Sequence, residues 1–174
     1  IRGFLDKRPR EIVSIIFEAY ITEEDVEKAF VDSGLIDYVH VQPKDEPWPT
    51  LQELIDSGHR LVVFTDERGV LPWHHYVWDY AWETHYSFET ANDFSCAINR
   101  GDMANSLFIL NHFLTQGFGS PVLARQANFN PLFVDRADQC QSESGRLPNF
   151  VTVDFYDIGN LFDVVDHLNG VATD

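Results

Sequence analysis

Two apolar segments of this chain each end in a single carboxylate, and these acids are the first residues whose position suggests chemistry. Glu18 follows the run IVSIIF at residues 12–17, and Asp154 follows FVTV at residues 150–153. Strands that are buried on both faces of a sheet are near-continuous apolar runs, so an acid at the end of one marks the point where packing stops. Two carboxylates at a suitable separation can act as an acid/base pair, as in sugar-cleaving hydrolases, and Glu18 and Asp154 are candidates for such a pair.

Strand and helix patterns alternate along the chain, which is typical of parallel βαβ units. Four expected strands end in a polar side chain, because Asp66 and Asn111 close apolar runs as Glu18 and Asp154 do. Barrel enzymes of the (β/α)8 type place their catalytic residues at this edge of the sheet, so the pattern favours a barrel over an open doubly wound sheet. No Gly-rich turn follows a strand, which disfavours a Rossmann-type nucleotide site.

Apolar spacing and capping residues predict the individual elements. His74 and His75 fall in a segment that is predicted to be a loop. A surface loop is favoured there over a metal-binding pair, because adjacent side chains on an extended backbone point to opposite faces. Strands are predicted at residues 11–18, 60–66, 76–82, 106–113 and 150–154, helices at 22–30, 50–55 and 160–169, and long loops at 67–75, 83–105 and 114–148.

Composition limits the possible partners. The 174 residues are 44% hydrophobic and 14% aromatic, which is enough for a sizeable core, and one domain is the default count. A formal charge of −16 argues against nucleic acid or an anionic membrane held by bulk electrostatics. No run of residues approaches the roughly 18 apolar residues of a membrane span.

The two cysteines, Cys96 and Cys140, lie in polar sequence that reads as loop. Free cysteines are among the most buried residue types, so this setting favours a disulfide and an oxidising compartment. Two unrelated free thiols are the alternative. Neither cysteine has the spacing of a metal site.

Five blocks of sequence together resemble the phosphatidylinositol-specific phospholipase C X-domain-like phosphodiesterases, and above all their secreted or surface-anchored branch. The resemblance spans nearly the whole chain, and its last block is the most specific. The blocks are EIVSIIFEAYIT (11–22), WPTLQELIDSGHRLVVFTD (48–66), a Trp/Tyr-rich segment that runs to SCAINRG (95–101), LFILNHFL (107–114) and LPNFVTVDFYDIGNLFDVVDHLNG (147–170).

The resemblance implies a distorted TIM barrel in which two histidines on early strands cleave a phosphodiester by general acid/base catalysis. Glu18 matches the carboxylate that helps to hold a divalent cation, Ca²⁺ or Mg²⁺, beside the phosphate in metal-dependent relatives. Asp154 matches the acid that hydrogen-bonds a catalytic histidine and fixes its tautomer. The alternatives are an ion pair of Glu18 with a basic group across the barrel mouth, and a capping role for Asp154 in the following turn.

The aromatic segment falls near the headgroup pocket of the family. Trp82, Glu83 and Tyr86 are the substrate-binding candidates there, because an aromatic face beside a carboxylate suits a polyol or sugar-like ring; ordinary loop packing is the alternative. Asn111 is expected to line the site, and Tyr156 of the last block is a further substrate-binding candidate.

One position departs from the family pattern at the expected phosphate site. Asp66 stands where several phospholipases keep a basic residue, so this substrate-binding candidate departs from the family pattern and inositol-phosphate specificity does not carry over.

The expected architecture is the C-terminal part of one barrel domain over residues 1–174, with about five of the eight strands of a complete barrel. The resemblance places the catalytic histidine pair upstream of residue 1, so we expect a phosphodiesterase of lipid headgroups or glycerophosphodiesters that is inactive as this chain alone. An extracellular or cell-surface location is expected. The alternative is an inactive barrel module that binds glycans or a protein partner.

Overall fold

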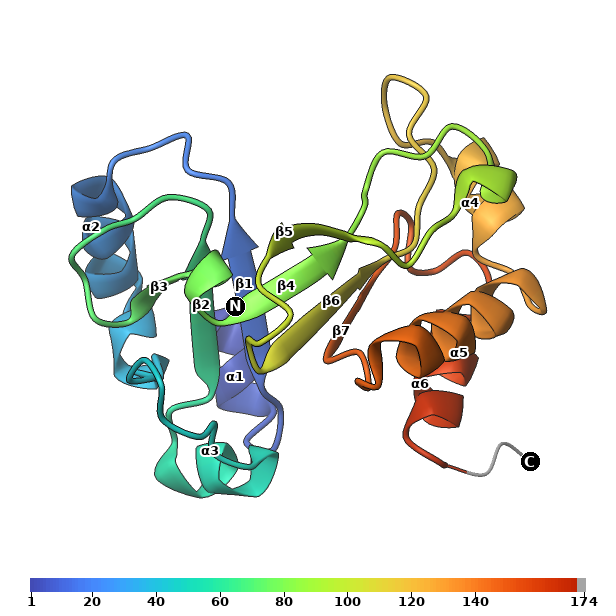
Figure 1. Ribbon diagram of the computed structural model, residues 1–174. Coiled ribbons are helices and arrows are strands. Elements are labelled where there is room, and N and C mark those ends of the chain that lie inside the picture. Colours follow the sequence, from blue (N-terminus) through green and yellow to red (C-terminus); the bar gives the residue numbers. More distant parts are fainter. Residues whose placement is uncertain (172–174) are drawn as a thin grey trace. The chain divides into compact units, whose positions relative to one another are not determined.

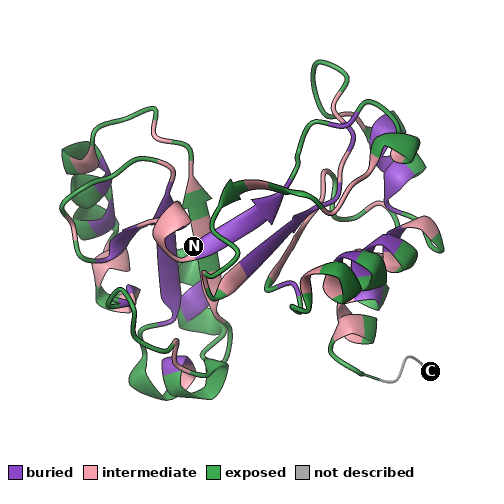
Figure 2. Cartoon of the chain, in the orientation of Figure 1, coloured by how far each residue is buried: buried purple, intermediate pink, exposed green. Residues whose placement is uncertain are grey.

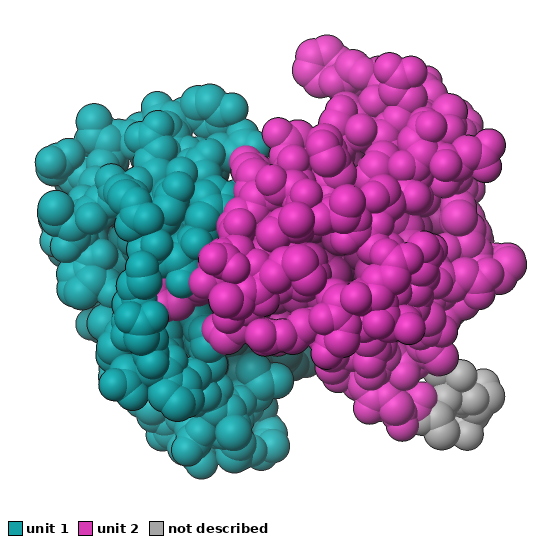
Figure 3. Space-filling view, in the orientation of Figure 1, with its two compact units in different colours: residues 1–79 teal, residues 80–174 magenta. Residues whose placement is uncertain are grey.

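A computed structural model describes residues 1–171 of the chain. Contacts between Cα atoms divide the chain into two compact units, Ile1–Asp79 and Tyr80–Asp174, which Figure 3 colours separately. Each unit has its own sheet and its own core (Figure 1). Within the described residues, no helix combines the length and the apolar character that crossing a membrane requires.

The first unit contains a parallel sheet of three strands in the order β1-β2-β3. Its central strand is buried throughout, whereas alternate residues of β1 are exposed (Figure 2). Apolar residues of β1, β2, α1 and α2 form the core. The elements are α1 (Arg2–Lys7), β1 (Val13–Phe17), α2 (Glu23–Ser33), η1 (Leu35–Tyr38), α3 (Leu51–Ser57), β2 (Leu61–Thr65), β3 (His74–Tyr76) and η2 (Val77–Asp79).

Local sequence explains where the two longer helices of this unit begin and end. The Thr22 hydroxyl accepts a hydrogen bond from the third amide of α2, and the helix ends at Gly34 in the left-handed conformation. A reciprocal capping box between Thr50 and Glu53 opens α3, which ends at Gly58 with φ +79°. Both helices confirm the sequence prediction to within a few residues.

The second unit has a mixed sheet in the order β5-β4-β6-β7, in which β4, β6 and β7 are parallel and β5 is antiparallel to β4. One face of this sheet packs on α5 and α6, where Trp82, Phe108 and Leu110 meet Phe133 and Val164. The elements are β4 (Ala81–Thr84), η3 (Ala91–Asp93), β5 (Ile98–Gly101), β6 (Leu107–Asn111), α4 (Pro121–Ala127), α5 (Leu132–Ser144), β7 (Phe150–Thr152) and α6 (Leu161–Leu168).

The mixed α/β class is confirmed, but a closed barrel is not: the described residues form two sheets with seven strands instead of about five. The single strand predicted at 76–82 is wrong, because η2 separates β3 from β4. The loop predicted at 114–148 is also wrong, since it contains α4 and α5. Prolines and many polar residues gave this segment its loop-like composition, whereas α5 packs on the core mainly through Phe133, Ala137 and Cys140.

The predicted disulfide is confirmed, although its surroundings differ from the prediction. Cys96 precedes β5, and its partner Cys140 is fully buried on α5, not in a loop. The bond closes a sequence separation of 44 residues and fixes α5 to the segment before β5.

Reduction of this disulfide should lower the free energy of unfolding of the second unit by about 3–4 kcal/mol, because the reduced unfolded chain regains the entropy of an open loop. Denaturant unfolding followed with and without reductant measures the change, and intact mass should rise by about two hydrogens on reduction. An unchanged unfolding midpoint after complete reduction would contradict the expectation.

A buried arginine fixes the end of β6. Arg136 of α5 donates to the Asn111 carbonyl at 2.5 Å and to the Ser95 carbonyl at 3.0 Å, and its guanidinium lies 4.2 Å from the centre of the Phe94 ring. It also lies 3.2 Å from Nδ1 of His112. Burial lowers the pKa of Arg136 to about 10, so the group stays charged at neutral pH and must be stabilised by the two carbonyls and the Phe94 ring.

Candidate active-site residues

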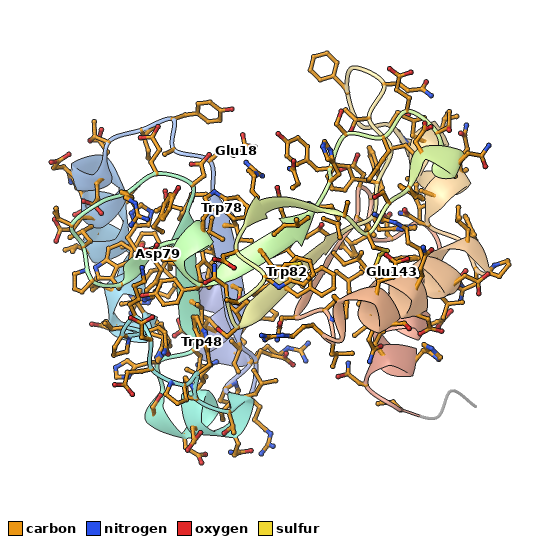
Figure 4. The ribbon with its side chains drawn as sticks, in the orientation of Figure 1. Glu18, Trp48, Trp78, Asp79, Trp82 and Glu143 are labelled. Atoms are coloured by element: carbon orange, nitrogen blue, oxygen red, sulfur yellow. A yellow bond between two sulfur atoms is a disulfide. The ribbon has the colours of Figure 1, made fainter. Side chains whose placement is uncertain are left out.

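Glu18 and Asp66 follow neighbouring strands at the carboxyl end of the first sheet. Phe17 of β1 pairs with Thr65 of β2, so each acid is the first residue beyond a paired position. Oδ1 of Asp66 accepts a hydrogen bond from the Ala19 amide at 2.9 Å, which holds the turn after β1 against the end of β2. The exposed Glu18 is labelled above the β1 arrow in Figure 4, and no ion pair reaches it from the described residues.

Tyr20 occupies one oxygen of Glu18. Its hydroxyl donates to Oε2 at 2.9 Å, although the residue is 86% exposed. This hydrogen bond, the charge of Glu18 and the charge of Asp66 all raise the pKa of Tyr20. The two carboxylates therefore act on the same hydroxyl group. Over residues 1–171 no three Asp, Glu, His or Cys side chains gather as a metal cage made of protein alone would require.

The second sheet buries a carboxylate at the carboxyl end of β4. Glu83 is 3% exposed, and its Oε1 accepts hydrogen bonds from Arg100 Nε at 2.5 Å and Asn99 Nδ2 at 2.9 Å, both on β5. Its Oε2 accepts from Asn111 Nδ2 at 2.9 Å, at the end of β6. Burying a charge is costly unless the charge is paired and hydrogen-bonded, and these three donors meet that condition.

The side chain of Asn111 orients the Glu83 carboxylate, so its amide is not free to bind a ligand. Besides Glu83, its Nδ2 donates to the Thr84 carbonyl at 2.8 Å. Its Oδ1 accepts from the Thr152 hydroxyl at 2.6 Å. Both ends of the amide are thus bonded, and the side chain links β4, β6 and β7 at one point.

Tyr86 and Arg100 form the outer part of the same cluster. The guanidinium carbon of Arg100 lies 4.8 Å from the centre of the Tyr86 ring, within the range of a cation–π contact. The Arg100 side chain is 44% exposed and Tyr86 is 41% exposed. An aromatic ring, a cation and a buried acid therefore lie together, with the ring and the cation open to solvent.

Trp82 does not belong to this cluster. Its ring stacks on Phe108 with centroids 3.9 Å apart, in the core that faces α5 and α6. Successive side chains of a strand point to opposite faces, so Trp82 and Glu83 cannot share one substrate surface. Figure 4 labels Trp82 beside β4. The structure thus makes Trp82 a core residue, which corrects its prediction as a substrate-binding residue.

Asp154 lies two residues beyond β7 in a tight turn. The next residue, Phe155, has φ +53°, a left-handed conformation that L-residues rarely adopt. The Asp154 carboxylate is seated so closely against Gly119 that a Cβ at that position would overlap with it. Among residues 1–171 no hydrogen bond or ion pair reaches this carboxylate, and it makes no capping bond to the following turn. Its oxygens are available to a partner.

Three of the histidines are fixed inside the two units. His74 and His75 are buried in β3, so their prediction as surface-loop residues is wrong. His75 donates from Nδ1 to the Val63 carbonyl and accepts the Gln42 amide at Nε2, both at 2.9 Å. Nδ1 of His74 lies 3.4 Å from Glu23. His112 follows β6 and is fully buried.

Comparison with known protein families identifies the family of this chain. The family model described as PI-PLC X 1 matches residues 1–169. The chain belongs to the PI-PLC X domain family. A PI-PLC X domain-containing protein of Arabidopsis thaliana is 32% identical over 98% of this chain and 43% of its own length. An uncharacterized secreted protein of Arthroderma benhamiae is 30% identical over 99% of this chain and 46% of its own length.

This PI-PLC X domain chain thus spans less than half the length of those two relatives. A PI-PLC X domain-containing protein 1 from the same fungus is 28% identical, over 98% of this chain and 63% of its own length. No solved structure matches the chain. One relative is named a secreted protein, and the disulfide of this PI-PLC X domain chain is likewise typical of proteins in an oxidising compartment.

Sequence reasoning missed Arg100, although the residue lies in the SCAINRG block that supports the family resemblance. The only sequence signal for Arg100 was a basic residue in the same predicted loop, 83–105, as the acid Glu83. The antiparallel strand β5 lies within that predicted loop. Tyr156, the remaining predicted site residue of this PI-PLC X domain chain, is 66% exposed in the turn after β7.

A cavity of about 790 Å³ lies elsewhere in the first unit. Residues of the segment between η1 and α3, α3 itself and His59 line it, among them Trp48 and three prolines. Val39 pairs with Leu61 at the amino end of β2, so the cavity lies away from the strand ends that carry Glu18 and Asp66. None of the predicted site residues of this PI-PLC X domain chain lines it.

Proposed function

We propose that this chain is part of a phospholipase C-like phosphodiesterase. The observation that carries the proposal is the free carboxylate of Asp154: no described residue neutralises it, and the sequence resemblance matches this residue to the family's histidine-orienting acid. A carboxylate in this role hydrogen-bonds one nitrogen of a histidine, which fixes the tautomer and stabilises the imidazolium.

In the proposed reaction, one histidine accepts the proton of the attacking hydroxyl, and a second donates a proton to the leaving oxygen of the phosphodiester. Asp154 stabilises the positive charge that forms on its histidine as the first proton moves. The proposal assigns both histidines to sequence outside residues 1–174, as the resemblance implies. Within the chain, His74, His75 and His112 are fixed in the interior of their units.

Glu18 and Asp66 are proposed to hold a divalent cation. Mg²⁺ is commonly bound by one or two carboxylates together with phosphate oxygens of the substrate, and two neighbouring strand-end carboxylates fit that pattern. When bound, such a cation would screen the charge on the phosphoryl oxygens.

Replacing Glu18 by Gln should reduce the stimulation of hydrolysis by Mg²⁺ or Ca²⁺, because one anionic ligand is lost. Activity of the natural protein and of Glu18→Gln is measured across a cation titration after chelation. Glu24→Gln, an exposed acid on α2, is the matched control. Undiminished wild-type activity in the presence of chelator would refute the cation proposal.

The cluster of Glu83, Arg100 and Tyr86 is proposed to bind the polyol part of the headgroup. Glu83→Gln should raise KM about tenfold or more, with a smaller effect on kcat, because an amide cannot accept hydrogen bonds from all three donors around it. Glu89→Gln, an exposed acid of the same unit, should leave KM unchanged. A wild-type KM for Glu83→Gln would remove this cluster from the substrate site.

The substrate class is tested with the natural protein, including any sequence that precedes residue 1. Vesicles of phosphatidylinositol, vesicles of phosphatidylcholine and a water-soluble glycerophosphodiester are compared as substrates. We expect phosphodiester cleavage of at least one, and none by residues 1–174 alone. Hydrolysis by this chain alone would refute the assignment of the histidines, whereas binding of a headgroup or glycan without cleavage would favour a non-catalytic module. The proposed location is extracellular or cell-surface.

A further inference from the structure

The turn that carries Asp154 is fixed by an asparagine from a distant part of the sequence. Asn128 caps the carboxyl end of α4 and is fully buried. Its Nδ2 donates hydrogen bonds to the Asp154 carbonyl at 2.9 Å and to the Ile158 carbonyl at 3.1 Å. Its own carbonyl accepts the Asn160 amide at 2.8 Å. One residue thus binds the turn at three positions, the first of which is the peptide unit of Asp154.

The backbone packs closely against this turn at two glycines. Gly159 has φ +95°, and a Cβ there would overlap with the Asn128 carbonyl. On the other side of α4, Gly119 approaches the Asp154 carboxylate equally closely. The segment 119–128 therefore contacts Asp154 twice, at its carboxylate through Gly119 and at its carbonyl through Asn128.

Among residues 1–171, the side-chain amide of Asn128 hydrogen-bonds to this turn alone. Both hydrogen bonds from Nδ2 go to carbonyls of residues 154–158, and its buried Oδ1 has no partner among residues 1–171. A buried amide that served only general packing would be expected to bond at both ends, because each unsatisfied polar atom is costly. Rotating the amide by 180° would bring its oxygen against two carbonyl oxygens, so its orientation is fixed by the turn.

We propose that Asn128 is a positioning residue for Asp154: by holding the backbone of the turn, it sets the direction in which the carboxylate meets its histidine. This inference rests on the proposed function, since Asp154 must orient a histidine for the position of its carboxylate to matter. Misplacing a catalytic group by about 1 Å can cost as much as about 10²-fold in rate.

A double-mutant cycle in the natural protein tests the inference. Asn128→Ala should lower kcat about tenfold, change KM less than twofold and shift the pH profile of kcat/KM in the same direction as Asp154→Asn. In the Asp154→Asn background, Asn128→Ala should have no further effect on kcat. Asn169→Ala, which removes another side-chain bond to a carbonyl, is the matched control and should keep wild-type kinetics.

An unchanged kcat in Asn128→Ala, or an equal loss in both backgrounds, would overturn the positioning role. If Asp154→Asn itself keeps full activity, the proposed function fails and the role of Asn128 in catalysis fails with it. The first pair of outcomes leaves the effect of Asp154→Asn intact, so the two failures are distinguishable.

Hydrogen exchange in the natural protein tests whether Asn128 holds the turn, without any measurement of activity. Gly159→Ala should accelerate exchange of the Ile158 and Asn160 amides roughly tenfold or more, because its methyl group displaces the turn from Asn128. Gly170→Ala is the matched control, since Gly170 also has a positive φ but no atom within 4 Å of the added carbon. Equal exchange in the turn of both variants would overturn the claim that Asn128 holds it.

Discussion

Replacing Asp154 by Asn should lower kcat of the natural protein by about 10²- to 10⁴-fold and leave KM nearly unchanged. The asparagine keeps the size of the side chain but loses the negative charge that stabilises an imidazolium. The pKa of the partner histidine should therefore fall, and the limb of the kcat/KM profile that this histidine controls should move to lower pH. The effect is large because no described residue neutralises this carboxylate, so its full charge acts on the imidazolium.

Asp157→Asn provides the matched control for this substitution. Asp157 is an exposed acid three positions further along the same turn, so its replacement changes the net charge of the turn by the same amount. We expect kinetics close to wild type for the control. Equal kinetics for Asp154→Asn and Asp157→Asn would show that only the general charge of the turn matters and would contradict the assigned role.

The second large effect concerns stability at low pH and originates at His112. Burial, together with the charge of Arg136, lowers the pKa of His112 to about 3, even though the hydrogen bond to the Ala127 carbonyl favours protonation. The unfolded chain titrates near pH 6.5, so between about pH 3 and 6.5 it binds more protons than the folded chain. Stability is therefore fully present above about pH 6.5 and falls by about 1.4 kcal/mol per pH unit below it.

Urea unfolding at pH 7 and pH 4.5 measures this term. His112 should contribute roughly 2–3 kcal/mol to the loss of unfolding free energy between the two values. His112→Gln should be less stable than wild type at pH 7, because the stacking of His112 on Phe133 is lost. Its loss of stability on acidification should be smaller than that of wild type by roughly 2–3 kcal/mol. His85→Gln, at an exposed position of the same unit, is the control. A wild-type loss in His112→Gln would contradict the prediction.

Elements with strong apolar patterns and capping residues were predictable from the sequence. The strands β1, β2 and β6 are continuous apolar runs, and the caps at Thr22 and Thr50 mark α2 and α3. By contrast, β3 begins with two histidines whose burial depends on hydrogen bonds to distant residues. The helix α5 begins after Pro131 without a side-chain cap, and one of its four buried residues is Arg136, so its sequence pattern did not distinguish it from loop.

The candidate site was predictable only in part, for geometric reasons. Asn111 is a predicted strand-end residue and Glu83 belongs to the predicted aromatic segment, but their contact depends on β4 pairing with β6, which no local pattern reveals. Arg100 reaches Glu83 because β5 turns back antiparallel to β4. Trp82 and Glu83 point to opposite faces because side chains alternate along a strand. This rule can be applied only once both residues are known to lie in one strand.

Phosphodiester cleavage itself is the central claim, and ³¹P NMR of a phosphatidylinositol or glycerophosphodiester substrate incubated with the natural protein tests it most directly. We predict that the diester signal decays at a rate proportional to protein concentration, that a new phosphate signal replaces it, and that Asp154→Asn slows the decay at least about 10²-fold. A diester signal that persists unchanged beside folded protein would contradict the proposed function.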